Sequence, residues 1–384
     1  MKWLFLLPAA SLAVVSLLNF FHAPEWMWAW KLAIVVGEFG HWLGLFALGL
    51  AGLACVSAAG GWRISTVLLC AAASVGFFRP AFCAWRMSPA IPGELQAAFG
   101  GRETSRPAFS LLRLFLGRGP GPVRVTTETL ARPDGVDLAL DFYAPPFAKD
   151  TTVRPPCLIV IHGGGWDSGD RTQLAAWNRR WATKGYAVAA VSYRLAPRWI
   201  WPAQREDVLA AISWLKAHAD RLGIDPARLI LIGRSAGGQI ATAVGYGAND
   251  PAIRGIVALY APHDMPFTWS VSREDDTINS IKLLRQLFGG PLDDGRRALY
   301  ESASGQLLAH AGSPPTLLLH GVPDTVSWYR HSERLAARLQ ELRVPHYFLR
   351  LPWATHGFDF NGDGPGAQLA DYAIDSFLRT VAAP

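Results

Sequence analysis

The feature that limits the possible folds most strongly is a serine flanked by glycines, located between a strand-like apolar run and a helix-like segment. The run 228–233 is short and apolar, as in a buried strand, and residues 239–244 continue as a helix would. Between them lies Gly233-Arg-Ser-Ala-Gly-Gly238. So sharp a turn has no room for side chains two residues either side of the serine. We therefore predict that Ser235 projects above a sheet at a helix N-terminus, where negative charge is favoured.

A second glycine run precedes it in the chain. His162-Gly-Gly-Gly-Trp166 follows the strand-like run 156–161. Three successive glycines leave backbone N–H groups uncovered, and such donors contribute on the order of 3 kcal/mol each when they face a developing oxyanion. Alone, the run is equally typical of a flexible turn, but its order relative to Ser235 favours an oxyanion hole.

The region 126–384 alternates strand and helix patterns, which predicts an α/β fold with a mostly parallel sheet covered by helices on both faces. Short apolar or alternating runs predict the strands, and 3.6-residue periodicity predicts the helices between them. The interval 262–312 has no clear strand, and it is either a partial cap over the site or a helical excursion at the sheet edge. The predicted strands are 136–143, 157–161, 187–191, 228–233, 255–260, 316–320 and 347–351.

Most of the chain's apolar excess lies in residues 1–85, for which we predict a membrane-embedded helical region. The uncharged runs 3–21 and 41–61 have spanning length. The run 64–78 is shorter and stops at Arg79-Pro80, so it spans only if the bilayer thins or the segment extends toward Trp85. Three tryptophans within 26–30 fit an interfacial belt. A cleaved signal peptide is the alternative for the first run. The basic residues leave open which side of the membrane the catalytic region faces.

Residues 86–125 are rich in Arg, Pro and Gly and are predicted to be a linker with one short amphipathic piece around 110–116. The net charge of the chain is +6, and arginines 102, 106, 113 and 118 fit either a juxtamembrane segment near anionic lipid or a solvated linker. No pattern supports nucleic-acid binding.

A serine hydroxyl needs a base to take its proton and a carboxylate to orient that base. Asp324 and His356 each follow a predicted strand after Ser235, so both would lie at the same sheet edge. These two are the predicted partners. Other candidates along the chain are His263, Asp264, His320 and His331.

The segment Asp359-Phe-Asn-Gly-Asp-Gly364 is similar to the start of a calcium-binding loop. The twelfth position of such a loop would be Ala370, which cannot supply the bidentate carboxylate. Neither a metal nor a cofactor is predicted.

Together these motifs resemble the α/β-hydrolase superfamily, within it the hormone-sensitive-lipase-like esterases and membrane-anchored carboxylesterases. The resemblance covers about residues 130–381 and includes Ser192-Tyr-Arg-Leu-Ala-Pro197. It implies Ser235 as nucleophile, His356 as base and then acid, and Asp324 as orienting carboxylate. It also implies an oxyanion hole made by the amides of Gly164, Gly165 and Ala236, with Gly163 as a further candidate.

Arg234 departs from the pattern, because many hormone-sensitive-lipase-like members carry Asp before the serine. Arg234 is similar to the form in formamidases, feruloyl-esterase-like and prenylcysteine-methylesterase-like hydrolases. The leading hypothesis is a membrane-bound serine hydrolase of lipid-like or acyl esters. An amide hydrolase, or a non-catalytic binding protein with this fold, is the alternative.

Overall fold

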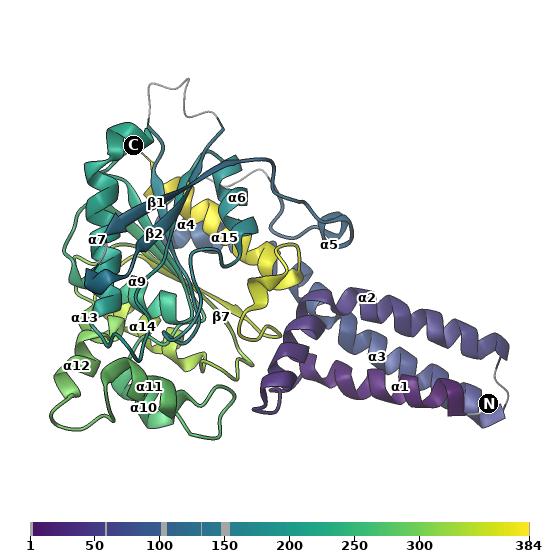
Figure 1. Cartoon of the computed structure of the whole chain (residues 1–384). Helices are drawn as coiled ribbons and strands as arrows, with labels where there is room; N and C mark the ends of the chain where they lie inside the picture. Colours follow the sequence, from purple (N-terminus) through teal and green to yellow (C-terminus); the bar gives the residue numbers. More distant parts are fainter. Residues whose placement is uncertain (1–2, 58–59, 101–105, 132, 147–153, 384) are drawn as a thin grey trace.

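The computed structural model describes residues 3–57, 60–100, 106–131, 133–146 and 154–383. Figure 1 shows a long helical bundle and an α/β domain beside one of its ends.

The α/β domain is built on one sheet of eight strands in the order β1-β2-β4-β3-β5-β6-β7-β8. β1 and β2 are antiparallel to their neighbours, and β3 to β8 run parallel to one another. This confirms the predicted α/β-hydrolase fold with a mostly parallel sheet. The strands are β1 (Arg124–Ala131), β2 (Leu138–Ala144), β3 (Cys157–Ile161), β4 (Ala187–Val191), β5 (Leu229–Arg234), β6 (Ile253–Leu259), β7 (Thr316–Gly321) and β8 (His346–Leu351).

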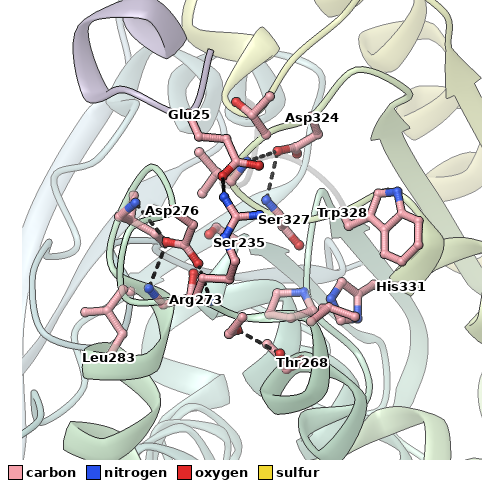
Figure 2. Close-up of a pocket in the computed structure, with 18 of the residues that line it drawn as sticks. Glu25, Ser235, Thr268, Arg273, Asp276, Leu283, Asp324, Ser327, Trp328 and His331 are labelled. Atoms are coloured by element: carbon pink, nitrogen blue, oxygen red, sulfur yellow. Dashed lines mark hydrogen bonds and ion pairs between the residues drawn. The ribbon is translucent and has the colours of Figure 1, made fainter. Parts of the chain in front are cut away.

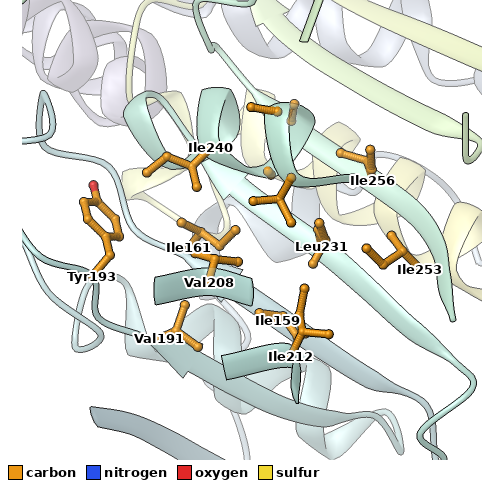
Figure 3. Packing of buried hydrophobic residues seen from close by; sticks show 14 of the residues in the cluster. Ile159, Ile161, Val191, Tyr193, Val208, Ile212, Leu231, Ile240, Ile253 and Ile256 are labelled. Carbon is orange, nitrogen blue, oxygen red and sulfur yellow. The ribbon is translucent and has the colours of Figure 1, made fainter. Parts of the chain in front are cut away.

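Helices cover both faces of the sheet because the central strands are apolar on both sides. Successive residues of β3 enter different cores, since Ile159 packs in one cluster and Leu158 in the other. Figure 3 shows Ile159 and Ile161 in the first cluster with Ile212 and Ile240. This first face is covered by α7 (Ala203–Ala217), α9 (Ala236–Gly247) and α14 (Arg330–Glu341), and the second by α4 (Ile91–Phe99), α6 (Ala175–Thr183) and α15 (Pro365–Val381).

The interval predicted as a cap or excursion lies between β6 and β7 and is helical. Its helices are α10 (Met265–Val271), α11 (Ser280–Phe288), α12 (Arg297–Ser302) and α13 (Gly305–Leu308). Leu283 and Leu287 on α11 are buried in the same core as the sheet, so the segment packs on the domain. The remaining short elements are α8 (Ala219–Leu222), η2 (Pro133–Gly135) and η3 (Phe358–Phe360).

The bundle consists of α1 (Trp3–Ser16) with η1 (Leu17–Asn19), α2 (Met27–Ser57) and α3 (Gly60–Met87). Small residues allow close packing: a Cβ at Gly40 would lie 2.7 Å from the carbonyl oxygen of Phe77. α3 continues through Pro80 to Met87, which is the extension toward Trp85 that the sequence left open for this run. Pro80 removes one backbone donor but is buried within the packed helix.

Two helices, α2 with 31 residues and α3 with 28, are long and apolar enough to cross a membrane. α1 has 14 residues. At about 1.5 Å per residue it is shorter than the ~30 Å hydrocarbon core of a bilayer. By length and composition the first predicted run is therefore a weaker candidate than the other two.

The segment 86–125 differs from the expected linker. It contains α4 and the start of β1, which were not expected, and also α5 (Leu111–Leu116), which coincides with the amphipathic piece expected around 110–116. Arg106 and Arg113 form ion pairs with Asp371, and Arg113 also pairs with Asp363. Their charges thus fix this segment to the α/β domain, and Arg102 lies outside the described residues.

Candidate active site

The strained turn around Ser235 has the geometry that its sequence predicts. Ser235 lies between β5 and α9 with φ 52° and ψ −122°, a conformation that side-chain-bearing residues rarely adopt. A Cβ at Gly233 would lie 2.1 Å from the Gly237 carbonyl oxygen, and one at Gly237 would lie 2.2 Å from that of Ile161. A side chain at either position would therefore overlap the backbone, so both residues must be glycine, as expected.

The structure brings Ser235, His356 and Asp324 into one hydrogen-bonded line. His356 Nε2 lies 2.9 Å from Ser235 Oγ, and His356 Nδ1 lies 2.8 Å from Asp324 Oδ2. Asp324 follows β7 and His356 follows β8. Since these strands are parallel to β5, all three residues lie at the same edge of the sheet.

Asp324 is held as a buried carboxylate. Its Oδ1 accepts hydrogen bonds from the amides of Val326 and Ser327, at 2.8 and 2.9 Å. Burial would raise the pKa of Asp324, but the charges and hydrogen bonds of His356 and His320 outweigh burial and hold that pKa well below its usual range. The carboxylate is thus ionised and ready to stabilise a protonated His356.

The competing candidates have other partners. Asp264 caps α10 and pairs with Arg334. His320 lies behind Asp324, with Nε2 3.2 Å from Oδ2. Burial is the main cause that lowers the pKa of His331 to about 3 and that of His263 well below 6.5. None of these candidates contacts Ser235 in the described part of the chain.

The glycine run forms a loop beside Ser235. Gly164 has φ 119° and Gly165 has φ 57°, and a Cβ at Gly164 would lie 2.2 Å from the carbonyl oxygen of Ser168. Within the described residues, the amides of Gly164, Gly165 and Ala236 donate no hydrogen bond. The Gly163 amide differs, because it donates to the side chain of Gln173 at 2.8 Å.

This partner removes Gly163 from the expected set of oxyanion donors. The preceding residue supports the loop: the His162 ring stacks on Tyr193 at 4.1 Å, and its Nδ1 donates to the Gly163 carbonyl at 2.7 Å. Burial lowers the pKa of His162 to about 4, so this ring is neutral near pH 7.

Arg234, which stands where many hormone-sensitive-lipase-like members carry Asp, supports His356 through Asp359 and Tyr260. It is buried, and its Nε donates to Asp359 at 2.5 Å. The other oxygen of Asp359 accepts from the Tyr260 hydroxyl at 2.6 Å, and the Tyr260 ring packs on His356 at 4.5 Å. Asp359 therefore serves this network, and the other acidic residue considered for calcium, Asp363, pairs with Arg113.

A bundle residue also reaches the site, which the sequence did not reveal. Trp30 Nε1 on α2 donates to the backbone carbonyl of His356 at 2.9 Å, and the two rings meet edge to face at 6.1 Å. Trp30 had been grouped with its neighbours as an interfacial belt. No local signal distinguishes it, because its partner is 326 residues away.

Two cavities meet at Ser235. One of about 390 Å³ extends towards α10 and α11 and is shown in Figure 2. There the Arg273 side chain pairs with Glu25, and the Arg273 backbone amide donates to Asp276. The other, of about 660 Å³, extends between α2 and the glycine loop. Both include the surfaces of Gly165, Ser235, Ile278, Leu283 and Val326.

Comparisons with known proteins agree with this geometry. The profile of the family described as BD-FAE matches residues 140–339. The chain is 30% identical to Esterase LipC of Mycobacterium tuberculosis over 61% of this chain and 60% of LipC. It is 26% identical to the Probable carboxylic ester hydrolase LipM of the same organism, over 92% of this chain and 87% of LipM. The LipM alignment thus includes most of the region before β1.

A solved structure described as Bacterial Heroin Esterase is similar, with a TM-score of 0.58 and 25% identity over 68% of this chain and 85% of that one. These three proteins are described as esterases or ester hydrolases, which favours esters over amides.

Proposed function

This chain belongs to the BD-FAE family and is a carboxylesterase- or lipase-like hydrolase, and we propose that Ser235, His356 and Asp324 hydrolyse its ester through an acyl-enzyme. The observation that carries this assignment is the unbroken line from Ser235 Oγ through the His356 ring to Asp324, at 2.9 and 2.8 Å. Nucleophile, base and orienting acid are then within hydrogen-bond reach of one another.

In the first step Ser235 Oγ attacks the ester carbonyl while its proton passes to His356 Nε2. Asp324 stabilises the imidazolium that forms. The carbonyl oxygen, now negative, accepts hydrogen bonds from the amides of Gly164, Gly165 and Ala236. His356 then gives the proton to the departing alkoxide, which leaves as the alcohol.

Water completes the reaction. His356 takes a proton from a water molecule, whose oxygen attacks the acyl-serine carbonyl. The second tetrahedral intermediate then collapses to the carboxylic acid, while His356 returns the proton to the departing Ser235 Oγ. The buried network of Arg234, Asp359 and Tyr260 keeps the His356 ring in place during both steps.

The proposed location is a membrane, with α2 and α3 as its spans. Less than half of each spanning window is buried, 28% in α2 and 44% in α3. Large apolar side chains cover the rest, such as Phe46 at 60% and Leu68 at 64% exposure. A surface of this kind on a soluble monomer would be unfavourable, and a bilayer removes the cost.

A short helix beside the bundle supports the same location. α5 exposes Leu111, Leu112 and Leu116, and its Phe115 ring contacts Trp42 of α2 at 5.4 Å. It therefore extends the apolar surface of the bundle. An amphiphilic, lipid-like ester is the substrate class that fits such a location.

Covalent labelling tests the assignment. The full chain in detergent is treated with a fluorophosphonate, and the modified peptide is identified by mass spectrometry. We expect one adduct on Ser235, lost in Ser235→Ala and retained in Ser270→Ala, whose exposed hydroxyl lies on α10. Folded protein that carries no Ser235 adduct would contradict the proposed function.

A further inference from the structure

We propose that the cavity between α2 and the glycine loop binds the apolar chain of the ester, so that the bundle supplies one wall of the substrate site. This inference rests on the proposed function and names the substrate more closely, as an ester with an apolar acyl chain longer than acetyl.

The wall from α2 consists of Met27, Trp30 and Ile34. These positions are three and four residues apart and therefore lie on one face of the helix. Across the cavity lie Leu174 and Phe360 of the α/β domain. The cavity volume of about 660 Å³ is within the range of roughly 300–1,000 Å³ found for small-molecule sites.

Ser235 and His356 both border this cavity, so a chain that lies in it is continuous with a carbonyl at the nucleophile. The cavity of about 390 Å³ on the other side of Ser235 has a different character. It carries the ion pair of Glu25 with Arg273, and also Asp276. A polar part of the ester fits there, and an apolar chain is better accommodated against α2.

The α2 wall is fixed to the domain at two places. Trp30 donates to the His356 carbonyl. Two turns further along, the buried Glu38 carboxylate accepts from the amide of Gly366 in the first turn of α15, at 3.2 Å. Because α2 is held at these two points, its wall is rigid enough to select acyl chains by length and shape.

The cavity lining includes residues that are themselves exposed on the exterior. Phe360 is 66% exposed and Met27 is 43% exposed. Next to them on α2, Trp28 and Val35 are exposed as well and continue the apolar exterior of the bundle. An acyl chain that lies against the apolar exterior of the bundle therefore reaches Ser235 along these apolar side chains.

Filling the cavity tests the proposal. The full chain in detergent is assayed with p-nitrophenyl acetate and p-nitrophenyl octanoate. Ile34→Trp is expected to lower the octanoate-to-acetate ratio of kcat/KM at least about tenfold, because the indole occupies the space of the chain. Ile34→Ala, which enlarges the cavity, is expected to raise the same ratio.

Leu45→Trp is the matched control, since Leu45 is an exposed residue further along α2, and we expect its ratio to stay within about twofold of wild type. Unchanged chain-length preference in both Ile34 variants, with Ser235 still labelled by fluorophosphonate, would overturn this inference alone. Wild-type protein inactive on both esters and unlabelled would instead overturn the proposed function on which it rests.

Discussion

The bundle and the α/β domain place their apolar residues in opposite ways. Of the 28 large apolar side chains that are exposed in the described residues, 20 belong to residues 7–85. The α/β domain instead buries its apolar side chains in two cores against its sheet. The domain therefore encloses its own core, whereas the bundle leaves many large apolar side chains exposed, which is the observation behind the proposed membrane location.

The two parts differ less where they meet. There the bundle buries Glu38, which accepts from the Gly366 amide of α15, and Trp30 donates to the His356 carbonyl. The comparison teaches that the chemistry belongs to the α/β domain, while the bundle shapes the space around it. Substitutions on the two sides of this junction are expected to differ in size and in kind.

The largest effect is expected inside the α/β domain. Asp324→Asn should lower kcat for p-nitrophenyl acetate about 10³–10⁴-fold, because the neutral amide no longer stabilises the imidazolium or holds its tautomer. Asp264→Asn is the control, since Asn also caps a helix, and steady-state kinetics should show little change. Similar losses in both variants would contradict the assignment of Asp324.

The pH dependence of stability should also arise inside this domain. The pKa values of His162 and His331 are lowered to about 4 and about 3 by burial. Between pH 6.5 and pH 4 the unfolded chain binds protons that the folded chain does not, so the free energy of unfolding decreases as the pH is lowered. For His162 the decrease is on the order of 3 kcal/mol. Thermal unfolding of the full chain at pH 7 and pH 4.5 measures this loss.

His331→Phe removes one of these groups and should make the unfolding midpoint less dependent on pH. The substitution keeps a ring beside Phe267, which the His331 ring contacts at 5.1 Å. An equal or steeper dependence in the variant would show that His331 does not stay neutral in the folded chain.

A smaller loss of activity is expected beneath the triad. Arg234→Met leaves Asp359 without its cationic partner, so Tyr260 loses its fixed position against His356, and kcat should fall about 10–100-fold. Because Asp359 is buried, stability should fall too. Kinetics at a temperature where the variant is folded separate the two effects, and unchanged kcat would show that the network only stabilises the fold.

The smallest effect is expected from the bundle. Trp30→Phe keeps a ring near His356 but removes the hydrogen bond to its carbonyl, which should lower kcat by about three- to tenfold. Trp28→Phe is the control on the same helix, since Trp28 is 61% exposed. Equal kcat in the two variants would break the comparison, because the bundle would then make no contribution to the position of His356.

The parts of the site that the sequence predicted depend on local geometry. The turn at Ser235 needs glycine at fixed spacing, and parallel strands bring Asp324 and His356 to the same edge. The strand β1 was missed because its sequence, RVTTETLA, is mostly polar and has neither an apolar run nor an alternating pattern, which an edge strand does not require.

The contacts of Trp30, Tyr260 and Gly163 were missed for a different reason. Each depends on a partner that only the tertiary fold supplies, such as the Gln173 side chain that occupies the Gly163 amide. Spacing along the chain carries no information on such partners. The role of Arg234 is of the same kind, since its partner Asp359 is 125 residues away.

The most direct test is the structure of the full chain in detergent after reaction with a p-nitrophenyl octylphosphonate. We predict that phosphorus is bonded to Ser235 Oγ and that the phosphonyl oxygen lies at the Gly164 and Ala236 amides. The octyl chain is expected to lie against Trp30 and Ile34 of α2. An octyl chain that instead lies in the cavity towards α10 and α11, or phosphorus bonded to another residue, would contradict the account.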